Sequence, residues 1–119
     1  MKAQLSMSIE EIDKDKKYQV IKFEGEFDKP GHSAIRDELE ELIKNFEGSS
    51  LIFDFKKLKF INSEGIGYLM EIHTHLVKDD KQLVIVYLNP HVKDVFETIG
   101  LAEIISIYKN LNEFLNSKK

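Results

Sequence analysis

The sequence predicts a single α/β domain with a mixed β-sheet of four to five strands that opens with an antiparallel hairpin and carries its helices mainly on one side. Two strand-like segments lie near the start, and strand-like runs then alternate with apolar stripes at helical spacing. The length of 119 residues, 42% of them hydrophobic, fits one compact domain spanning residues 1–119. A second domain has no room.

The opening hairpin is predicted from residues 5–27. Leu5, Met7 and Ile9 recur at every second position, a charged cluster follows over 13–17, and an apolar strand resumes over 18–27. Two neighbouring strands separated by a short polar segment favour antiparallel pairing.

The first helix is expected after the loop signal Lys29-Pro30-Gly31, opening at His32 or Ser33 and closing at Gly48. Its apolar positions fall on one face, namely Ile35, Leu39, Leu42, Ile43 and Phe46. The nearly continuous apolar run 51–55 then predicts a central strand that is covered on both faces.

A second helix is predicted to begin at Asn62 and Ser63, which suit an N-cap. Its apolar stripe comprises Ile66, Leu69, Met70, His73, Leu76 and Val77. A strand is expected over 83–88, ended by Asn89-Pro90. Beyond it we expect a short helix (Val92, Val95, Phe96, Ile99) ending at Gly100, a last strand (Ile104, Ile105, Ile107) and a terminal helix (Leu111, Phe114, Leu115).

Composition and charge argue against several classes of function. The 21 acidic and 17 basic residues are scattered and give a net charge of −4, so the basic surface expected of a nucleic-acid binder is missing. The absence of cysteine excludes disulfides, thiolate metal sites and cysteine nucleophiles. The first eight residues are too polar for a signal peptide, and no apolar run approaches about 18 residues, so we expect a cytoplasmic protein without a membrane span.

The loop of residues 62–67 is the best candidate site, because it follows a central strand and opens a helix. Backbone N–H groups and the helix dipole favour an anion at such a position, so a phosphate on Ser63 would be accommodated at little conformational cost. The alternative interpretation is ordinary helix capping by Asn62 and Ser63. Gly65 and Gly67 lack the third glycine of a dinucleotide fingerprint, and no Gly-Lys-Ser/Thr loop follows, so no cofactor is expected.

Neither a metal site nor a catalytic apparatus is expected. His73 and His75 are two residues apart in a predicted helix and point to different faces, while His32 and His91 are typical of helix starts. None of the four has an obvious nucleophile as a neighbour, and no acid–base pair stands out. The sequence therefore indicates a protein that is not an enzyme.

A basic cluster, Lys56, Lys57 and Lys59, precedes the Ser63 loop. It could attract an acidic partner or a phosphate, but three lysines on a loop are more typical of a solvated surface. Asp28, at the end of a predicted strand, is interpreted as a turn residue unless its neighbours give it another role.

Three segments resemble the STAS family, whose name combines sulfate transporters with anti-sigma factor antagonists. They are residues 25–28 (GEFD), 51–55 (LIFDF) and 60–67 (FINSEGIG). The similarity covers nearly the whole chain, and its length favours the stand-alone bacterial anti-sigma factor antagonists over transporter tails. The resemblance implies the mixed sheet and opening hairpin already described.

In those regulators a serine in the pattern Asp-Ser-x-Gly-hydrophobic-Gly is phosphorylated by an anti-sigma factor that is itself a serine kinase, and Ser63 occupies that place. The resemblance implies partner switching: the unmodified protein binds the anti-sigma factor and frees the sigma factor, phosphorylation breaks the complex, and a serine phosphatase restores it. Asp28 matches an acidic residue of the neighbouring loop. The partner-binding residues implied in this way are Asp28, Asn62, Ser63, Glu64 and Gly65.

The sequence departs from the family pattern on both sides of the serine. Asn62 stands where Asp is usual, and Glu64 stands where a small neutral residue is common. Both residues suit a helix start. The carboxylate of Glu64 could, however, repel incoming ATP phosphates or partly imitate the phosphorylated state.

Two other functions are compatible with the sequence to different degrees. A constitutive adaptor or scaffold subunit, in a signalling or lipid-transport complex, would keep the fold and leave Ser63 unmodified. A phosphoacceptor receiver domain would need an acidic pair after its first strand and an acceptor Asp at the end of a later strand. Asp54 lies inside its predicted strand and the first two strands form a hairpin, so the receiver interpretation ranks low.

Overall fold

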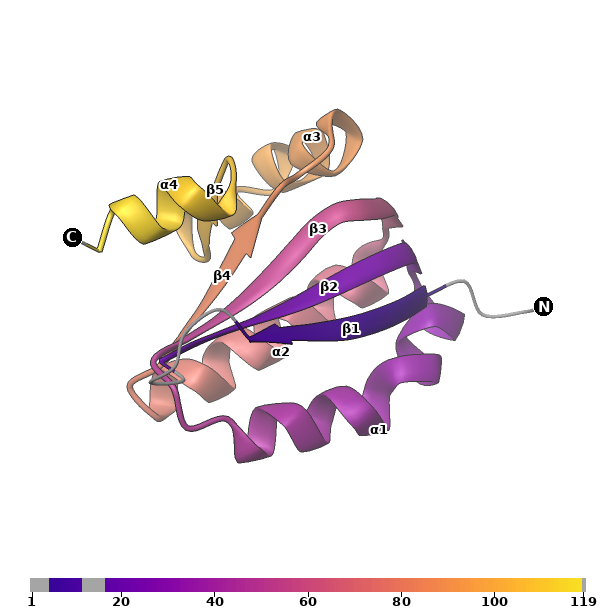
Figure 1. Cartoon of the computed structure of the whole chain (residues 1–119). Helices are drawn as coiled ribbons and strands as arrows, with labels where there is room; N and C mark the ends of the chain where they lie inside the picture. Colours follow the sequence, from indigo (N-terminus) through magenta and orange to yellow (C-terminus); the bar gives the residue numbers. More distant parts are fainter. Residues whose placement is uncertain (1–4, 12–16, 119) are drawn as a thin grey trace.

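The computed structural model describes residues 5–11 and 17–118. Its sheet has five strands in the order β1-β2-β3-β4-β5, in which β1 is antiparallel to β2 and every later neighbour is parallel (Figure 1). The strands are β1 (Leu5–Glu11), β2 (Tyr18–Phe27), β3 (Ser50–Ile61), β4 (Gln82–Val86) and β5 (Ser106–Tyr108). The predicted mixed sheet with an opening hairpin is confirmed, although Ile12 and residues 13–16 of the predicted turn lie outside the described residues.

Each of the four described α-helices begins after an Asp or Asn whose side chain accepts a hydrogen bond from a backbone N–H three residues on. This cap satisfies one of the N–H groups that a helix start leaves unpaired. The helices are α1 (Lys29–Asn45, capped by Asp28), α2 (Ser63–Lys78, Asn62), α3 (Pro90–Thr98, Asn89) and α4 (Leu111–Asn116, Asn110).

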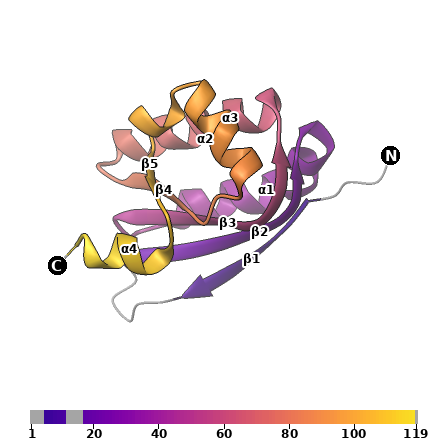
Figure 2. The ribbon, with the colours of Figure 1, turned by 90° about the horizontal axis from the view of Figure 1, so that it is seen from above.

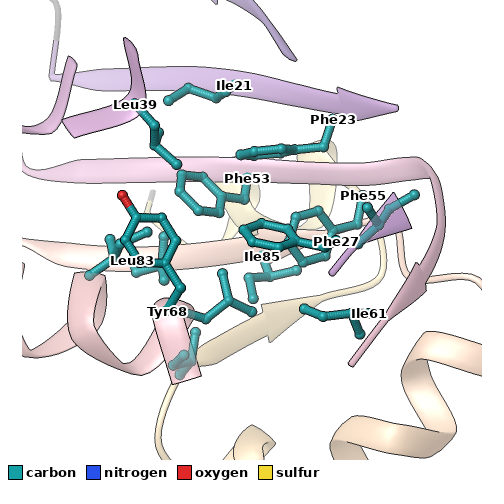
Figure 3. Packing of buried hydrophobic residues seen from close by; sticks show 14 of the residues in the cluster. Ile21, Phe23, Phe27, Leu39, Phe53, Phe55, Ile61, Tyr68, Leu83 and Ile85 are labelled. Atoms are coloured by element: carbon teal, nitrogen blue, oxygen red, sulfur yellow. The ribbon is translucent and has the colours of Figure 1, made fainter. Parts of the chain in front are cut away.

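The sheet separates two hydrophobic clusters. The larger one packs α1, α2 and α3 against one face and contains most of the buried phenylalanines (Figure 3). The smaller one lies on the other face, where Phe114 of α4 covers Val20, Ile52 and Val84. Figure 2 shows α4 apart from the other three helices. The expectation of helices mainly on one side is therefore confirmed.

Strand β3 contains two extra residues relative to β2. The pairing shifts by one residue between Lys22 and Glu24 and again between Gly25 and Glu26. Each bulge reverses which later side chains point toward the larger cluster, because side chains alternate along a strand. Leu58 and Ile61 therefore both reach the core, although they are three residues apart.

Helix α1 begins at Lys29, earlier than the predicted start at His32 or Ser33. Lys29-Pro30-Gly31 is not a loop but the first turn of α1, with Pro30 where its missing N–H costs nothing. The helix also ends at Asn45, so Gly48 does not close it. Asp28 is accordingly a helix cap, because its Oδ1 accepts from the Gly31 N–H at 2.9 Å.

Several other positions also differ from expectation. The three lysines at 56, 57 and 59 belong to β3 and not to a loop. Val77 is exposed, and Tyr68 and Ile72 take its place in the buried face of α2. The fourth strand ends at Val86 because Tyr87 has a left-handed backbone with φ of 61°. Ile104 is exposed and precedes the last strand, which starts at Ser106.

Candidate functional site

The Asp28 and Ser63 loops lie at the same edge of the sheet, where the parallel strands β2 and β3 end. Phe27 pairs with Ile61 in the register of these strands. The N–H of Asn62 donates to the Phe27 carbonyl oxygen at 3.2 Å, which ties the second loop to the first. The structure therefore brings together the two loops that the sequence singled out separately.

Both loops follow one plan, in which an Asx cap is followed three residues later by a buried glycine. Asn62 Oδ1 accepts from the Gly65 N–H at 3.2 Å, as Asp28 does from Gly31. A Cβ at Gly65 would lie 2.6 Å from the Phe27 carbonyl oxygen, and one at Gly31 would lie 2.2 Å from the Glu26 carbonyl oxygen. Only glycine lets each helix start approach the neighbouring backbone so closely.

Ser63 is the first residue of α2 and its side chain is exposed, as is that of Glu64. The helix behind them is held by the buried residues Tyr68, Leu69 and Ile72. A helix start carries partial positive charge from its unpaired N–H groups, and the Glu64 carboxylate already lies in that first turn. The site thus presents a reachable hydroxyl on a rigid, anion-tolerant support.

Among the five predicted partner-binding residues, Asn62 and Asp28 are engaged as caps and Gly65 is buried in the loop packing. Of the five, only Ser63 and Glu64 are exposed, so these two side chains offer most to an incoming partner. The Asx-x-x-Gly spacing shared by 28–31 and 62–65 could have revealed the common plan from the sequence.

An aromatic pair lies behind the Ser63 loop, between α1 and α2. The His32 and Tyr68 rings are 3.9 Å apart, and neither His32 Nε2 nor the Tyr68 hydroxyl has a hydrogen-bond partner among the described residues. Burial raises the pKa of Tyr68 to about 12 and lowers the pKa of His32, so both groups favour the neutral form. The sequence indicated neither the contact nor the role of Tyr68 in it.

The other histidines lie where the helix pattern predicted. His73 is half-buried and His75 is exposed, 3.9 Å from Asp79, and the Nδ1 of His73 has no partner in the described part of the chain. Over residues 5–11 and 17–118, no cluster of three or more His, Cys, Asp or Glu side chains suited to a metal ion is found. Within the same ranges, no helix is both long and apolar enough to span a bilayer.

Comparison with known families adds to this geometry. The STAS domain model matches residues 7–114, which include both loops and all five strands except the first two residues of β1. The chain belongs to the STAS domain family. A protein named anti-sigma F factor antagonist, from Paenibacillus polymyxa, is 23% identical over 91 residues, covering 76% of this chain and 78% of that protein.

Solved structures share the fold. An anti-sigma factor antagonist from Mycobacterium paratuberculosis superposes with a TM-score of 0.82 at 19% identity, covering 98% of this chain and 97% of the other. The Bacillus cell fate determinant SpoIIAA in its phosphorylated form gives a TM-score of 0.69 at 20% identity, covering 96% and 100% of the two chains. At such identities these likenesses show the fold alone.

Proposed function

We propose that this STAS protein is an anti-sigma factor antagonist that acts by partner switching and is controlled by phosphorylation of Ser63. The observation that carries the proposal is the exposed Ser63 hydroxyl at the first position of α2, beside the Asp28 loop. The unmodified protein binds an anti-sigma factor that is also a serine kinase. Phosphorylation releases it, and a serine phosphatase resets the switch.

The local structure supports a switch that works at the surface and does not refold the protein. A phosphate on Ser63 brings roughly two negative charges to a helix start, which tolerates them because its N–H groups and dipole are positive. A partner surface shaped for a neutral hydroxyl would instead meet a dianion. The names of the relatives support the same proposal, since they include anti-sigma factor antagonists and a phosphorylated SpoIIAA.

The proposal is tested with three variants and the purified serine-kinase anti-sigma factors of the source organism. Ser63→Asp should weaken binding by about tenfold or more, equivalent to ~1.4 kcal/mol, with little change in melting temperature. Ser63→Ala should bind like the wild type and resist release by the kinase with ATP. Glu64→Ser should accelerate phosphorylation, because it removes a carboxylate that repels the incoming γ-phosphate.

Calorimetry measures the affinities, and mass spectrometry locates the phosphate. If Ser63→Asp binds as tightly as the wild type and no phosphate appears on Ser63, the switch is wrong. Loss of binding accompanied by a large drop in melting temperature would also contradict a mechanism confined to the surface.

A constitutive adaptor is the second candidate function, and the negative charge of Glu64 beside Ser63 favours it. This exposed carboxylate follows Ser63 in the first turn of α2, where it provides permanent negative charge. An adaptor would bind its partner equally well with Ser or with Asp at position 63. The affinity of Ser63→Asp therefore distinguishes the two candidates directly.

A further inference from the structure

Large apolar side chains are exposed at five described positions, but one differs from the rest. Single exposed apolar residues are common on protein surfaces and need no function. Phe60 is different because it lies three residues before Ser63, at the sheet edge that carries both loops, and is 37% exposed. The other four are Ile9, Val77, Ile99 and Ile104.

The second bulge of β3 is what turns Phe60 outward. Gly25 pairs with Leu58 and Glu26 pairs with Phe60, so Lys59 is the extra residue. In a regular strand, Phe60 would share the buried face of Leu58, and Ile61 would point the other way. The bulge exchanges these orientations, so Ile61 is buried and Phe60 is left at the surface.

Helix α3 then holds a histidine ring against the exposed phenylalanine. The rings of Phe60 and His91 are nearly parallel, at 18°, with their centroids 6.1 Å apart. Asn89 fixes this arrangement, because its Oδ1 accepts from the Val92 N–H at 2.8 Å while its Nδ2 donates to the Leu58 carbonyl oxygen at 2.6 Å. The start of α3 is thereby bound to β3 two residues before Phe60.

From this geometry we infer that the Phe60–His91 pair is a contact surface for the anti-sigma factor, adjoining Ser63 and independent of its phosphorylation. The inference rests on the proposed function, whose partner must cover the Ser63 loop. A pre-ordered aromatic pair loses little conformational freedom on binding, which is why rigid aromatic residues often dominate interface energies. The pair contributes affinity, while Ser63 provides the switch.

Charge defines the complementary chemistry on the partner. Lys57 and Lys59 precede Phe60 on β3, both exposed, and Lys57 Nζ is only loosely paired with Glu24 Oε1 at 3.9 Å. An apolar side chain flanked by Asp or Glu on the anti-sigma factor would match this surface. Apolar contact would then determine mainly the dissociation rate, and the lysines would mainly increase the association rate.

The test compares Phe60→Ser with Val77→Ser in the full chain. Val77 is also apolar and is more exposed, at 51%, but it lies near the far end of α2. Binding of the unphosphorylated variants to the purified serine-kinase anti-sigma factor is measured by calorimetry, with melting temperatures recorded in parallel. We expect Phe60→Ser to lower the affinity about tenfold or more and Val77→Ser to stay within about twofold of the wild type.

Two further variants separate the contributions. His91→Ser leaves the sequence of β3 unchanged and removes the ring that supports Phe60, so it should weaken binding about threefold or more. If Phe60→Ser does not fold, His91→Ser becomes the decisive variant. Lys59→Glu should slow association and reduce its salt dependence.

If Phe60→Ser, or His91→Ser in its place, binds the anti-sigma factor with wild-type affinity, the inference is wrong and the Ser63 switch is unaffected. The inference is also wrong if Val77→Ser loses as much affinity as that variant. If the wild type binds none of these anti-sigma factors, the proposed function fails, and this inference fails with it.

Discussion

Gly65 is the residue on which the geometry of the Ser63 loop most directly depends. A Cβ there would lie 2.6 Å from the Phe27 carbonyl oxygen and 2.7 Å from the side chain of Ile61. Gly67 lies two residues further along the same helix, and a Cβ there would have nothing within 4 Å. The packing therefore requires glycine at position 65 but not at position 67.

Gly65→Ala should destabilise the protein by about 1–3 kcal/mol, because backbone atoms cannot move aside as a flexible side chain can. Gly67→Ala should stabilise it by up to about 1 kcal/mol, because alanine favours a helix interior. Urea unfolding followed by circular dichroism measures both. Equal effects of the two substitutions would show that the close approach at Phe27 does not control the loop.

His32 should make the stability of the domain sensitive to mild acid. Burial, and secondarily the Arg36 guanidinium, lowers the pKa of His32 below its usual 6.5, and the nearby carboxylates of Glu71, Glu40 and Glu64 oppose this only in part. The unfolded chain therefore takes up a proton at higher pH than the folded one. The contribution of His32 to stability is complete above pH about 6.5 and is lost as the pH falls toward the lowered pKa of His32 in the folded state.

Replacing His32 by Gln should flatten the dependence of unfolding free energy on pH between about 7 and 5. His75→Gln removes an exposed imidazole on α2 and serves as the control. Chemical unfolding at several pH values measures both slopes. An unchanged slope in His32→Gln would contradict a half-buried imidazole that stays neutral at this position.

At the scale of single elements, β3 is the strand that shapes the site. Its first bulge leaves the Lys56 N–H out of the regular ladder, and Asp54 Oδ1 accepts from this group at 2.9 Å. Asp54 is only 8% exposed, on the central strand as predicted. A buried carboxylate thus has a structural role, because it satisfies the backbone of the bulge.

Asp54→Ala should destabilise the protein by about 1–3 kcal/mol, because the Lys56 N–H loses its acceptor. Asp54→Asn retains an Oδ1 in nearly the same shape and should cost less. Thermal unfolding ranks the two variants. An equal loss in the Asn and Ala variants would mean that the negative charge of Asp54, and not an oxygen acceptor for the bulge, is what the site requires.

At the scale of the whole molecule, one hydrophobic cluster supports the site from beneath. Leu69 is fully buried in it on the inner face of α2, while Val77 on the same helix is 51% exposed. The position of Ser63 therefore depends on packing two turns further along its helix. Loss of that packing would affect stability before it affected the chemistry of the loop.

Leu69→Ala should destabilise the domain by about 2–5 kcal/mol, because it removes apolar contacts and leaves a cavity. Val77→Ala should change the stability by no more than about 0.5 kcal/mol. Denaturant unfolding of both variants provides the comparison. A small effect of Leu69→Ala would indicate that α2 repacks readily and that the loop is less rigidly held than the contacts imply.

The sequence by itself determined the order of the elements, the hairpin and the start of α2. These features depend on local signals: the alternation of Leu5, Met7 and Ile9, apolar stripes at helical spacing, and Asn62 beside small residues. Ser63 could be selected as a site residue for the same reason, because its exposure at a helix start follows from the neighbouring pattern. The predicted start of α1 was wrong because Lys29-Pro30-Gly31 carries the signals of a loop turn as well as those of a first helical turn.

Only the tertiary structure decided how β3 is paired and what surrounds its end. The bulges depend on register with β2, which lies more than twenty residues earlier, so no local pattern shows that Phe60 points outward. Asn89 and His91 reach β3 from α3, and Tyr68 meets His32 only because two helices pack side by side. Local sequence specifies elements through short-range periodicity, whereas these contacts arise between segments far apart in the chain and exist only once the sheet has formed.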